Sequence, residues 1–339
     1  MADRVPIAVL GTGRIGRLHA ENLTHRVPAA EVVAVADVVE PAAEACAAEL
    51  GITQIYTDPQ RAIEDSGAEA VVICSSTDTH ADLIEQAAAA GQHVFCEKPI
   101  ALDLARIDRA LQAVERAGVK LQVGFNRRFD PNFARARQLV AEGEAGRVHL
   151  LRITSRDPAP PPLDYVKVSG GLFLDMMIHD FDMARFMVGD EVEELYTAAG
   201  VLVDPAIGEA GDVDTAAVTL KFRGGAIGVI DNSRRATYGY DQRVEVFGDR
   251  GRVVVGNPRP HTASTSGERG DAGPPLMDFF IERYTQSYVN ELNAFIGCLQ
   301  TDTAPTVTGI DGRVPVVMGH AARRSLEENR PVRLDEIEI

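Results

Sequence analysis

Short apolar runs alternate with amphipathic, alanine-rich stretches from residue 6 to about residue 123. The runs are near-continuous in β-branched and other apolar residues, which is typical of parallel strands covered on both faces. They are PIAVLG, EVVAVAD, AVVICS, HVFCE and KLQVGF, and the stretches between them predict helices beginning near Ile15, Pro41, His80 and Asp103. This alternation predicts a doubly wound, Rossmann-type parallel sheet.

After about residue 124 the pattern changes to longer helices and strands of alternating polarity, such as VHLLRITSR, AAVTLKF, AIGVIDNSR and QRVEVFG. Short turns such as 223–225 join consecutive strands and indicate an antiparallel meander. The chain is therefore predicted to be α/β, with a dinucleotide-binding domain over 1–123 and an α+β domain over 124–339. The weakly patterned stretches 155–171 and 256–275 are predicted to be surface loops.

Composition and charge narrow the class of protein. The length of 339 residues, with 45% hydrophobic and 25% charged residues, fits two folded domains. A net charge of −16 disfavours nucleic acid and anionic membranes as partners and suits a neutral or cationic small substrate. The four cysteines lack metal-ligand spacing, so we expect reduced thiols. Without a recognisable signal segment or a run of about 18 apolar residues, we expect a cytoplasmic protein.

A glycine-rich turn lies where the first predicted strand meets its helix. The pattern GxGxxG at this place binds a dinucleotide, because free amides at the helix start face the pyrophosphate. The motif residues are Gly11, Thr12, Gly13, Arg14, Ile15 and Gly16. A glycine turn without a ligand is the alternative interpretation.

Asp37 closes the second predicted strand, 21 residues beyond Gly16. A carboxylate there can accept hydrogen bonds from the adenosine ribose hydroxyls, and it would repel the 2′-phosphate of NADP. The residues after it, Val38 and Val39, carry no compensating positive charge. The predicted cofactor is therefore NAD, although a solvent-facing carboxylate is the alternative.

Two further strand ends belong to the same predicted crevice, since ligands of open α/β sheets bind at the carboxyl ends of strands. They contribute the predicted cofactor-binding residues Ser75, Thr77, His80, Glu97 and Lys98. His80 stands at a helix start, where capping the helix is an equally good explanation. Lys98, between a strand end and a proline, can touch both cofactor and substrate.

A second constellation lies in the segment GGLFLDMMIHDFD over 170–182. Asp175, His179 and Asp182 are spaced i, i+4, i+7 and would share one face of a helix. A histidine oriented by a carboxylate can take the proton of a hydroxyl, as alcohol oxidation by hydride transfer requires. Metal ligation and a buried structural histidine stay open as alternatives, but we predict no metal because this chemistry needs none.

Several motifs together resemble the Gfo/Idh/MocA family of NAD(P)-dependent oxidoreductases. They are GTGRIG, EKP at 97–99, GFNRRFD at 124–130 and the GGLFLDMMIHDFD block. Within the family, NSRRATYGYDQRVEVFG at 232–248 and ERYTQSYVNELNAF at 282–295 look like inositol 2-dehydrogenases. The resemblance covers the whole chain. It implies a second domain with a large open sheet that packs in a homotetramer.

The resemblance also implies roles for single residues. Lys98, Asp175 and His179 would form a catalytic triad, with His179 as general base. Arg127, Asp182 and Tyr238 would contact substrate hydroxyls. The implied reaction is NAD-dependent oxidation of a cyclic polyol, with myo-inositol giving 2-keto-myo-inositol as the favoured case. A scyllo-inositol or pyranose sugar dehydrogenase is the alternative, and an NAD-sensing regulator on the same fold is the alternative outside enzymes.

Overall fold

The computed structural model describes residues 4–337, and contacts within the chain divide them into two compact units. The first unit holds the residues up to Phe129 together with Gln286–Val316. The second holds Asp130–Thr285 together with the chain from Val317 onward. The predicted division after residue 123 lies close to Phe129. The prediction treated 124–339 as one continuous domain, whereas Gln286–Val316 belongs to the first unit.

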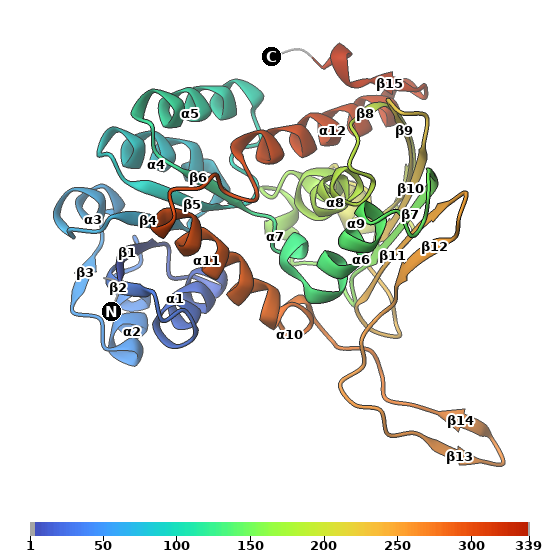
Figure 1. Ribbon diagram of the computed structural model, residues 1–339, viewed down its shortest axis with the longest axis horizontal. Coiled ribbons are helices and arrows are strands. Elements are labelled where there is room, and N and C mark those ends of the chain that lie inside the picture. The colour runs from blue at the N-terminus through green and yellow to red at the C-terminus, as the bar shows by residue number, and fades with distance from the viewer. Residues whose placement is uncertain (1–3, 338–339) are drawn as a thin grey trace. The chain divides into compact units, whose positions relative to one another are not determined.

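The first unit is built on a six-stranded sheet with the order β3-β2-β1-β4-β5-β6, and every strand pair in it is parallel (Figure 1). The strands are β1 (Val5–Leu10), β2 (Ala30–Ala36), β3 (Gln54–Tyr56), β4 (Ala70–Ile73), β5 (His93–Glu97) and β6 (Leu121–Gly124). The order reverses at β1, as in a doubly wound sheet, and this confirms the predicted Rossmann-type fold. The three-residue β3 was too short to show a sequence pattern.

Helices connect these strands and cover the sheet. They are α1 (Arg14–Arg26), α2 (Glu40–Leu50), α3 (Pro59–Asp65), α4 (Thr77–Ala89), α5 (Leu104–Ala117), the 3₁₀ turn η1 (Asn126–Phe129) and the returning α11 (Thr285–Gln300). Leu292 and Phe295 of α11 are fully buried in the same apolar cluster as Val9 and Phe95. The rings of Phe95 and Phe295 meet edge to face, with centroids 5.8 Å apart. A distant segment thus completes the core of the first unit.

The second unit contains a seven-stranded sheet with the order β12-β11-β7-β10-β9-β8-β15. The strands are β7 (Val148–Arg156), β8 (Val192–Gly200), β9 (Thr215–Phe222), β10 (Ile227–Ser233), β11 (Asp241–Gly248), β12 (Arg252–Val255) and β15 (Val332–Arg333). Strands β8, β9 and β10 form the predicted antiparallel meander. The meander does not continue into β11, because β7 lies between β10 and β11 and pairs with β10 in parallel. The sheet is therefore mixed, although mainly antiparallel.

The second unit also contains shorter helical segments (Figure 1). They are α6 (Pro131–Ala141), α7 (Leu163–Val166), the π-helical turn η2 (Leu172–Met176), α8 (Ile178–Val188), α9 (Pro205–Glu209), α10 (Phe280–Arg283) and the 3₁₀ turn η3 (Leu334–Glu336). Of these segments, α6 contacts β12 and α8 contacts β7. The long helix α12 (Gly309–Glu328) contains the Val316–Val317 boundary between the units. Along β9 buried and partly or fully exposed residues alternate, so one face of the sheet is left open.

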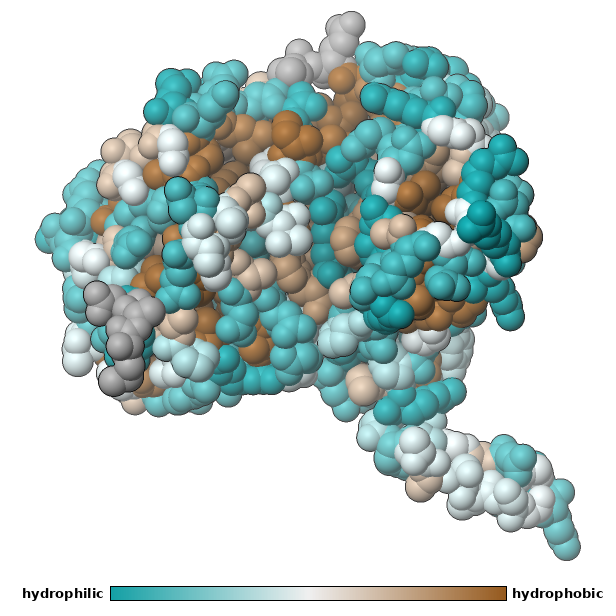
Figure 2. Space-filling view, in the orientation of Figure 1, coloured by the Kyte–Doolittle hydropathy of each residue, from teal (hydrophilic) through white to brown (hydrophobic). Residues whose placement is uncertain are grey.

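The segment 256–275 forms an exposed arm instead of an irregular loop. Two short strands within it, β13 (Thr265–Gly267) and β14 (Gly270–Ala272), pair as a hairpin, and all of their residues are exposed. The arm projects from the remainder of the second unit, and Figure 2 shows mainly hydrophilic and neutral residues along it. Residues 155–171 begin in β7 and include α7, and the stretch between these elements is without regular structure. Among residues 4–337, no helix has both the length and the apolar character needed to cross a membrane.

Candidate functional site

The glycine turn of the first unit connects β1 to α1, and two of its glycines are required by packing. Gly11 has φ +92°, and a Cβ on it would lie 2.6 Å from the amide nitrogen of Ser75. A Cβ on Gly16 would lie 1.8 Å from the carbonyl oxygen of Gly11. Both approaches are to backbone, which cannot move aside cheaply. These glycines bring the start of α1 against the ends of β1 and β4.

Gly13 differs from its neighbours, because no packing contact requires it. A Cβ on Gly13 would meet no atom within 4 Å, and its φ of −64° suits any residue. It is the N-cap of α1, and no side chain caps the helix there. Gly13 and Arg14 are exposed, and Ile15 is partly exposed. An uncapped helix start beside a position without a side chain fits a cofactor pyrophosphate.

Asp37 lies beside this turn, directly after β2. One of its carboxylate oxygens accepts from the Thr12 amide at 2.7 Å and from the Thr12 hydroxyl at 3.0 Å, and the other accepts from the Val39 amide at 2.9 Å. The carboxylate thus joins the glycine turn to the end of β2. A carboxylate can accept about four hydrogen bonds, so it retains capacity for a ribose hydroxyl. The two residues after Asp37, Val38 and Val39, are exposed at 77% and 56%. Since both are apolar, neither offers a positive charge that could bind the 2′-phosphate of NADP.

The ends of β4 and β5 approach the same edge of the sheet. The hydroxyls of Ser75 and Thr79 are 2.6 Å apart, and Thr77 begins α4. His80 is 2% exposed, and its two ring nitrogens lie 2.8 Å from the Pro99 carbonyl and 3.0 Å from the Ser75 carbonyl. Both nitrogens are therefore occupied by backbone. These contacts favour a positioning role for His80, which holds the two strand ends together, over direct contact with a cofactor.

Glu97 is the last residue of β5, and Lys98 follows it. The two side chains lie in different surroundings. One oxygen of Glu97 lies 2.7 Å from Nε2 of the buried His19, and the other accepts from the Lys98 amide at 3.3 Å. The Glu97 side chain is only 14% exposed. The side chain of Glu97 is thus turned into the protein, and the predicted contact of this strand end with the cofactor stays a prediction. Lys98 is partly exposed at the strand end, and the peptide bond between Lys98 and Pro99 is cis.

The second unit carries Asp175 and His179 in a segment that is otherwise core. In the described stretch 171–185, only these two residues are partly exposed, while all the others are buried. The expected continuous α-helix is wrong here, because Asp175 lies in the π-helical turn η2 and His179 in α8. The Met177 amide donates to the Leu172 carbonyl, which is the i→i−5 bond of a π-turn. Two ionisable groups therefore reach the surface of a buried segment.

Donors from two other segments hold Asp175. Its carboxylate accepts from the Tyr165 hydroxyl at 2.9 Å and from the Arg234 guanidinium at 3.1 Å. Arg234 is 3% exposed and also lies 3.4 Å from Asp157. Burial alone would lower the pKa of Arg234, but Asp175 and Asp157 outweigh it and raise the pKa. Asp175 is thus fixed as a carboxylate against a permanent positive charge.

Sequence reasoning missed both donors: Arg234 lies 59 residues from Asp175, and Tyr165, ten residues away, lies in a weakly patterned stretch that was predicted to be a surface loop. The only available signal was the paired arginine in NSRRATYGYDQ after the predicted strand. Asp157 follows β7, in the stretch that was predicted to be a surface loop. It is linked to Asp175 through Arg234, which bonds to both carboxylates.

The remaining predicted substrate residues lie in different surroundings. Asp182 is 1% exposed in α8, and Arg127 is 5% exposed in η1 of the first unit. The Tyr238 hydroxyl donates to Asp241 at 2.7 Å and accepts from Arg156 at 3.1 Å. The ring is 51% exposed and lines a surface pocket of about 470 Å³ with Arg243 and Asn257. The expected substrate contacts of these three residues stay predictions.

The first unit matches the family model described as the oxidoreductase family with an NAD-binding Rossmann fold, over residues 5–125. The second unit matches the GFO/IDH/MocA C-terminal domain over residues 133–254. These matches confirm the predicted NAD-binding fold, and the arrangement of Gly11, Gly13 and Gly16 fits that cofactor.

Relatives resemble the chain along nearly its full length. The chain is 52% identical to a myo-inositol 2-dehydrogenase of Thermotoga maritima, covering 98% of this chain and 99% of the relative. It is 47% identical to an inositol 2-dehydrogenase of Rhizobium meliloti, covering 97% and 98%. The structure of a scyllo-inositol dehydrogenase from Lactobacillus casei with bound NAD(H) and scyllo-inositol superposes with a TM-score of 0.93 at 30% identity, covering 98% of this chain and all of that one. Full-length similarity and both domain matches agree, and the chain belongs to the GFO/IDH/MocA family of NAD-binding oxidoreductases.

Proposed function

We propose that this protein oxidises a ring hydroxyl of a cyclic polyol with NAD+, and that its preferred reaction converts myo-inositol to 2-keto-myo-inositol. One observation carries the proposal: Asp175 and His179 are the two partly exposed groups in the otherwise buried stretch 171–185. A proton-transfer site requires an acid–base pair that the substrate can reach while the surrounding residues hold the pair in place. The names of the relatives point to inositols as the substrate class.

The proposed roles follow from the contacts of each residue. His179 accepts the hydroxyl proton, and Asp175 supports it from a position fixed by Tyr165 and Arg234. The Lys98 ammonium stabilises the negative charge that develops on the reacting oxygen. Bound NAD+ supplies the hydride acceptor at C4 of its nicotinamide ring.

The proposed chemistry balances with these groups alone. The carbon–hydrogen bond breaks as hydride, the hydroxyl proton passes to His179, and the carbon–oxygen bond becomes a carbonyl. The substrate is neutral, which is consistent with a protein of net charge −16. No metal ion takes part in this scheme.

Scyllo-inositol is the second candidate substrate, because a relative of the same fold was solved with that polyol bound. The two isomers differ in the orientation of one hydroxyl. We propose Arg127, Asp182 and Tyr238 as residues that contact substrate hydroxyls and contribute to this choice. Turnover of myo-inositol, scyllo-inositol and glucose with NAD+, followed as NADH absorbance, decides between them. Failure to oxidise any inositol would overturn the proposed substrate class.

Substitution of the catalytic residues tests the mechanism. His179→Ala should lower kcat by at least about 100-fold, because it removes the general base. Lys98→Ala should abolish turnover. Both variants should still bind NAD+, measured by calorimetry, and His25→Ala, which changes an exposed histidine on α1, is the matched control. Wild-type kcat in His179→Ala would contradict the assignment of the base.

We also propose that the protein is a homotetramer assembled through the open face of the second sheet. Ile227, Phe247 and Val254 lie on strands of this sheet and are exposed at 48%, 44% and 53%. Exposed apolar side chains that gather on one surface mark a protein–protein interface, whereas single ones do not. Phe247→Asp should shift the mass measured by light scattering to smaller species, and an unchanged tetramer would exclude this residue from the interface.

Since inositol oxidation draws on the common NAD+ pool, we place the enzyme in the cytoplasm, in inositol catabolism.

A further inference from the structure

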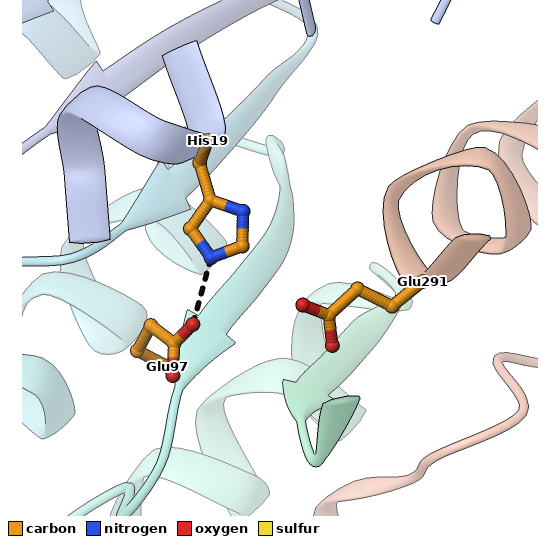
Figure 3. Close-up of side chains that lie close together, drawn as sticks. All are labelled: His19, Glu97 and Glu291. Atoms are coloured by element: carbon orange, nitrogen blue, oxygen red, sulfur yellow. Dashed lines mark hydrogen bonds and ion pairs between the residues drawn. The ribbon is translucent and has the colours of Figure 1, made fainter. Parts of the chain in front are cut away.

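Three ionisable side chains meet inside the first unit. His19 comes from α1, Glu97 from the end of β5, and Glu291 from the returning helix α11. Figure 3 shows the three side chains directed toward one another. One potential ligand atom of each lies within 4.8 Å of the corresponding atoms of the other two.

The cluster is buried and its hydrogen bonding is incomplete. His19 and Glu291 are both 0% exposed, and the Glu97 side chain is 14% exposed. His19 Nε2 lies 2.7 Å from a Glu97 oxygen, but His19 Nδ1 and both carboxylate oxygens of Glu291 have no hydrogen-bond partner. A buried carboxylate without a donor costs several kcal/mol or more, so native proteins rarely retain one. Something at this place must satisfy Glu291.

Among residues 4–337, no protein donor lies at hydrogen-bond distance from the Glu291 carboxylate. The ring of His19 packs edge to face against Phe95 and Tyr288, with centroids 5.3 and 5.7 Å away. The backbone carbonyl of Glu291 accepts a hydrogen bond from Gln122, and this fixes the helix turn that carries the carboxylate.

We propose that His19, Glu97 and Glu291 bind a divalent transition-metal ion, with Zn²⁺ as the favoured case. One imidazole and two carboxylates are a set of ligands that Zn²⁺ accepts, and Mn²⁺ is the weaker competitor. In the tetrahedral geometry of Zn²⁺, metal–ligand bonds of about 2.0–2.2 Å place two ligand atoms about 3.3–3.6 Å apart. The side chains therefore need to close by about 1 Å from the separation of up to 4.8 Å.

Charge supports an ion of this valence. Two carboxylates and a neutral imidazole carry −2, so a divalent cation makes the buried cluster neutral. The ion would replace the hydrogen bond between His19 Nε2 and Glu97, and the single proton of the neutral imidazole would then lie on Nδ1.

The proposed ion would be structural and not catalytic. It would join α1, β5 and α11, three segments distant in the sequence. Glu97 also accepts from the Lys98 amide, so the ion would hold the strand end that carries Lys98. This site is independent of the proposed dehydrogenase chemistry, which uses no metal.

Metal binding to the full chain tests the site. The protein is stripped with a chelator, dialysed against Zn²⁺ or Mn²⁺, and analysed by plasma mass spectrometry and calorimetry. The wild type should take up one equivalent of Zn²⁺. Glu291→Gln, which keeps the shape of the side chain, should weaken binding at least tenfold. Glu21→Gln is the matched control, because it makes the same change at an exposed position of α1.

A crystal of the Zn²⁺-loaded wild type should show an anomalous difference peak between the three side chains. This measurement decides the question even if Glu291→Gln fails to fold. Absence of tight Zn²⁺ binding, equal binding by Glu291→Gln, or a peak elsewhere would overturn the proposal. A water molecule without anomalous signal at this position would show that Glu291 is instead satisfied by a proton and solvent.

Discussion

Gly13 and Gly16 belong to one motif, but the structure separates what each does. Gly16→Ala places a Cβ 1.8 Å from the carbonyl oxygen of Gly11 and 2.8 Å from its carbonyl carbon. Cβ atoms do not approach backbone atoms this closely, so α1 must move away from the ends of β1 and β4. Overpacking of a well-packed core costs about 1–3 kcal/mol or more, and a clash with backbone lies at the upper end. We therefore expect Gly16→Ala to lose about 3 kcal/mol or more.

Gly13→Ala makes the same chemical change three residues earlier and serves as the matched comparison. Its Cβ meets no atom within 4 Å, and its φ of −64° is open to alanine. Alanine is a slightly poorer N-cap than glycine, so the free energy of unfolding should change by less than about 1 kcal/mol. The new methyl group instead occupies the place where the pyrophosphate approaches the backbone. NAD+ affinity should fall at least tenfold, or about 1.4 kcal/mol.

The two variants are compared by thermal unfolding, followed by circular dichroism, and by calorimetric titration with NAD+. A loss of 3 kcal/mol lowers Tm by about 6–12 °C for a domain of this size class. The expected pattern is a destabilised Gly16→Ala and a stable Gly13→Ala that binds NAD+ poorly. The reasoning fails if both variants melt alike, or if Gly13→Ala binds NAD+ with wild-type affinity.

Three further outcomes are expected. Asp37→Ala should weaken the preference for NAD+ over NADP+, measured as the ratio of kcat/KM values, because the carboxylate that repels a 2′-phosphate is removed; a wild type that prefers NADP+ would refute this. Arg234→Ala should cost about 3 kcal/mol, since Asp175 and Asp157 lose their buried partner, and a melting temperature equal to the wild type would contradict it. Burial lowers the pKa of His80 below its usual 6.5, so the folded state resists protonation and stability should fall as pH drops below about 6.5. His80→Gln should lose this part of the pH dependence of Tm, and an unchanged profile would assign it to other groups.

The features predicted correctly from sequence are those in which neighbouring residues decide the outcome. The strand and helix pattern over 6–123 depends on local periodicity, and it led to the doubly wound sheet. The glycine turn depends on the spacing of Gly11, Gly13 and Gly16, and the structure gives each a distinct environment. The position of Asp37 at the end of β2 was predicted correctly. Its hydrogen bonds to Thr12 connect two turns that are distant in the sequence, so the sequence of neither turn predicts them.

The features that sequence did not predict depend on contacts between distant segments. The helix containing Leu292 and Phe295 has an ordinary amphipathic pattern, and nothing local assigns it to the core of the first unit. The insertion of β7 between β10 and β11 is likewise a choice of pairing partner, since all three strands have compatible patterns. The contact between Glu97 and His19 of α1 likewise joins segments 78 residues apart, and no local pattern indicates it.

The stretch 171–185 shows why spacing alone was insufficient for the proposed catalytic pair. The i, i+4 spacing of Asp175 and His179 predicts one helical face, but apolar residues surround both positions, so an α-helix pattern cannot say which side is covered. The π-turn at Leu172–Met176 changes the rotation of Asp175 relative to α8. With Asp175 inside the π-turn and His179 in the α-helix that follows, both side chains are partly exposed while their neighbours are buried. The exposure of this pair therefore coincides with a local departure from regular α-helix, and π-turns are frequent at functional sites.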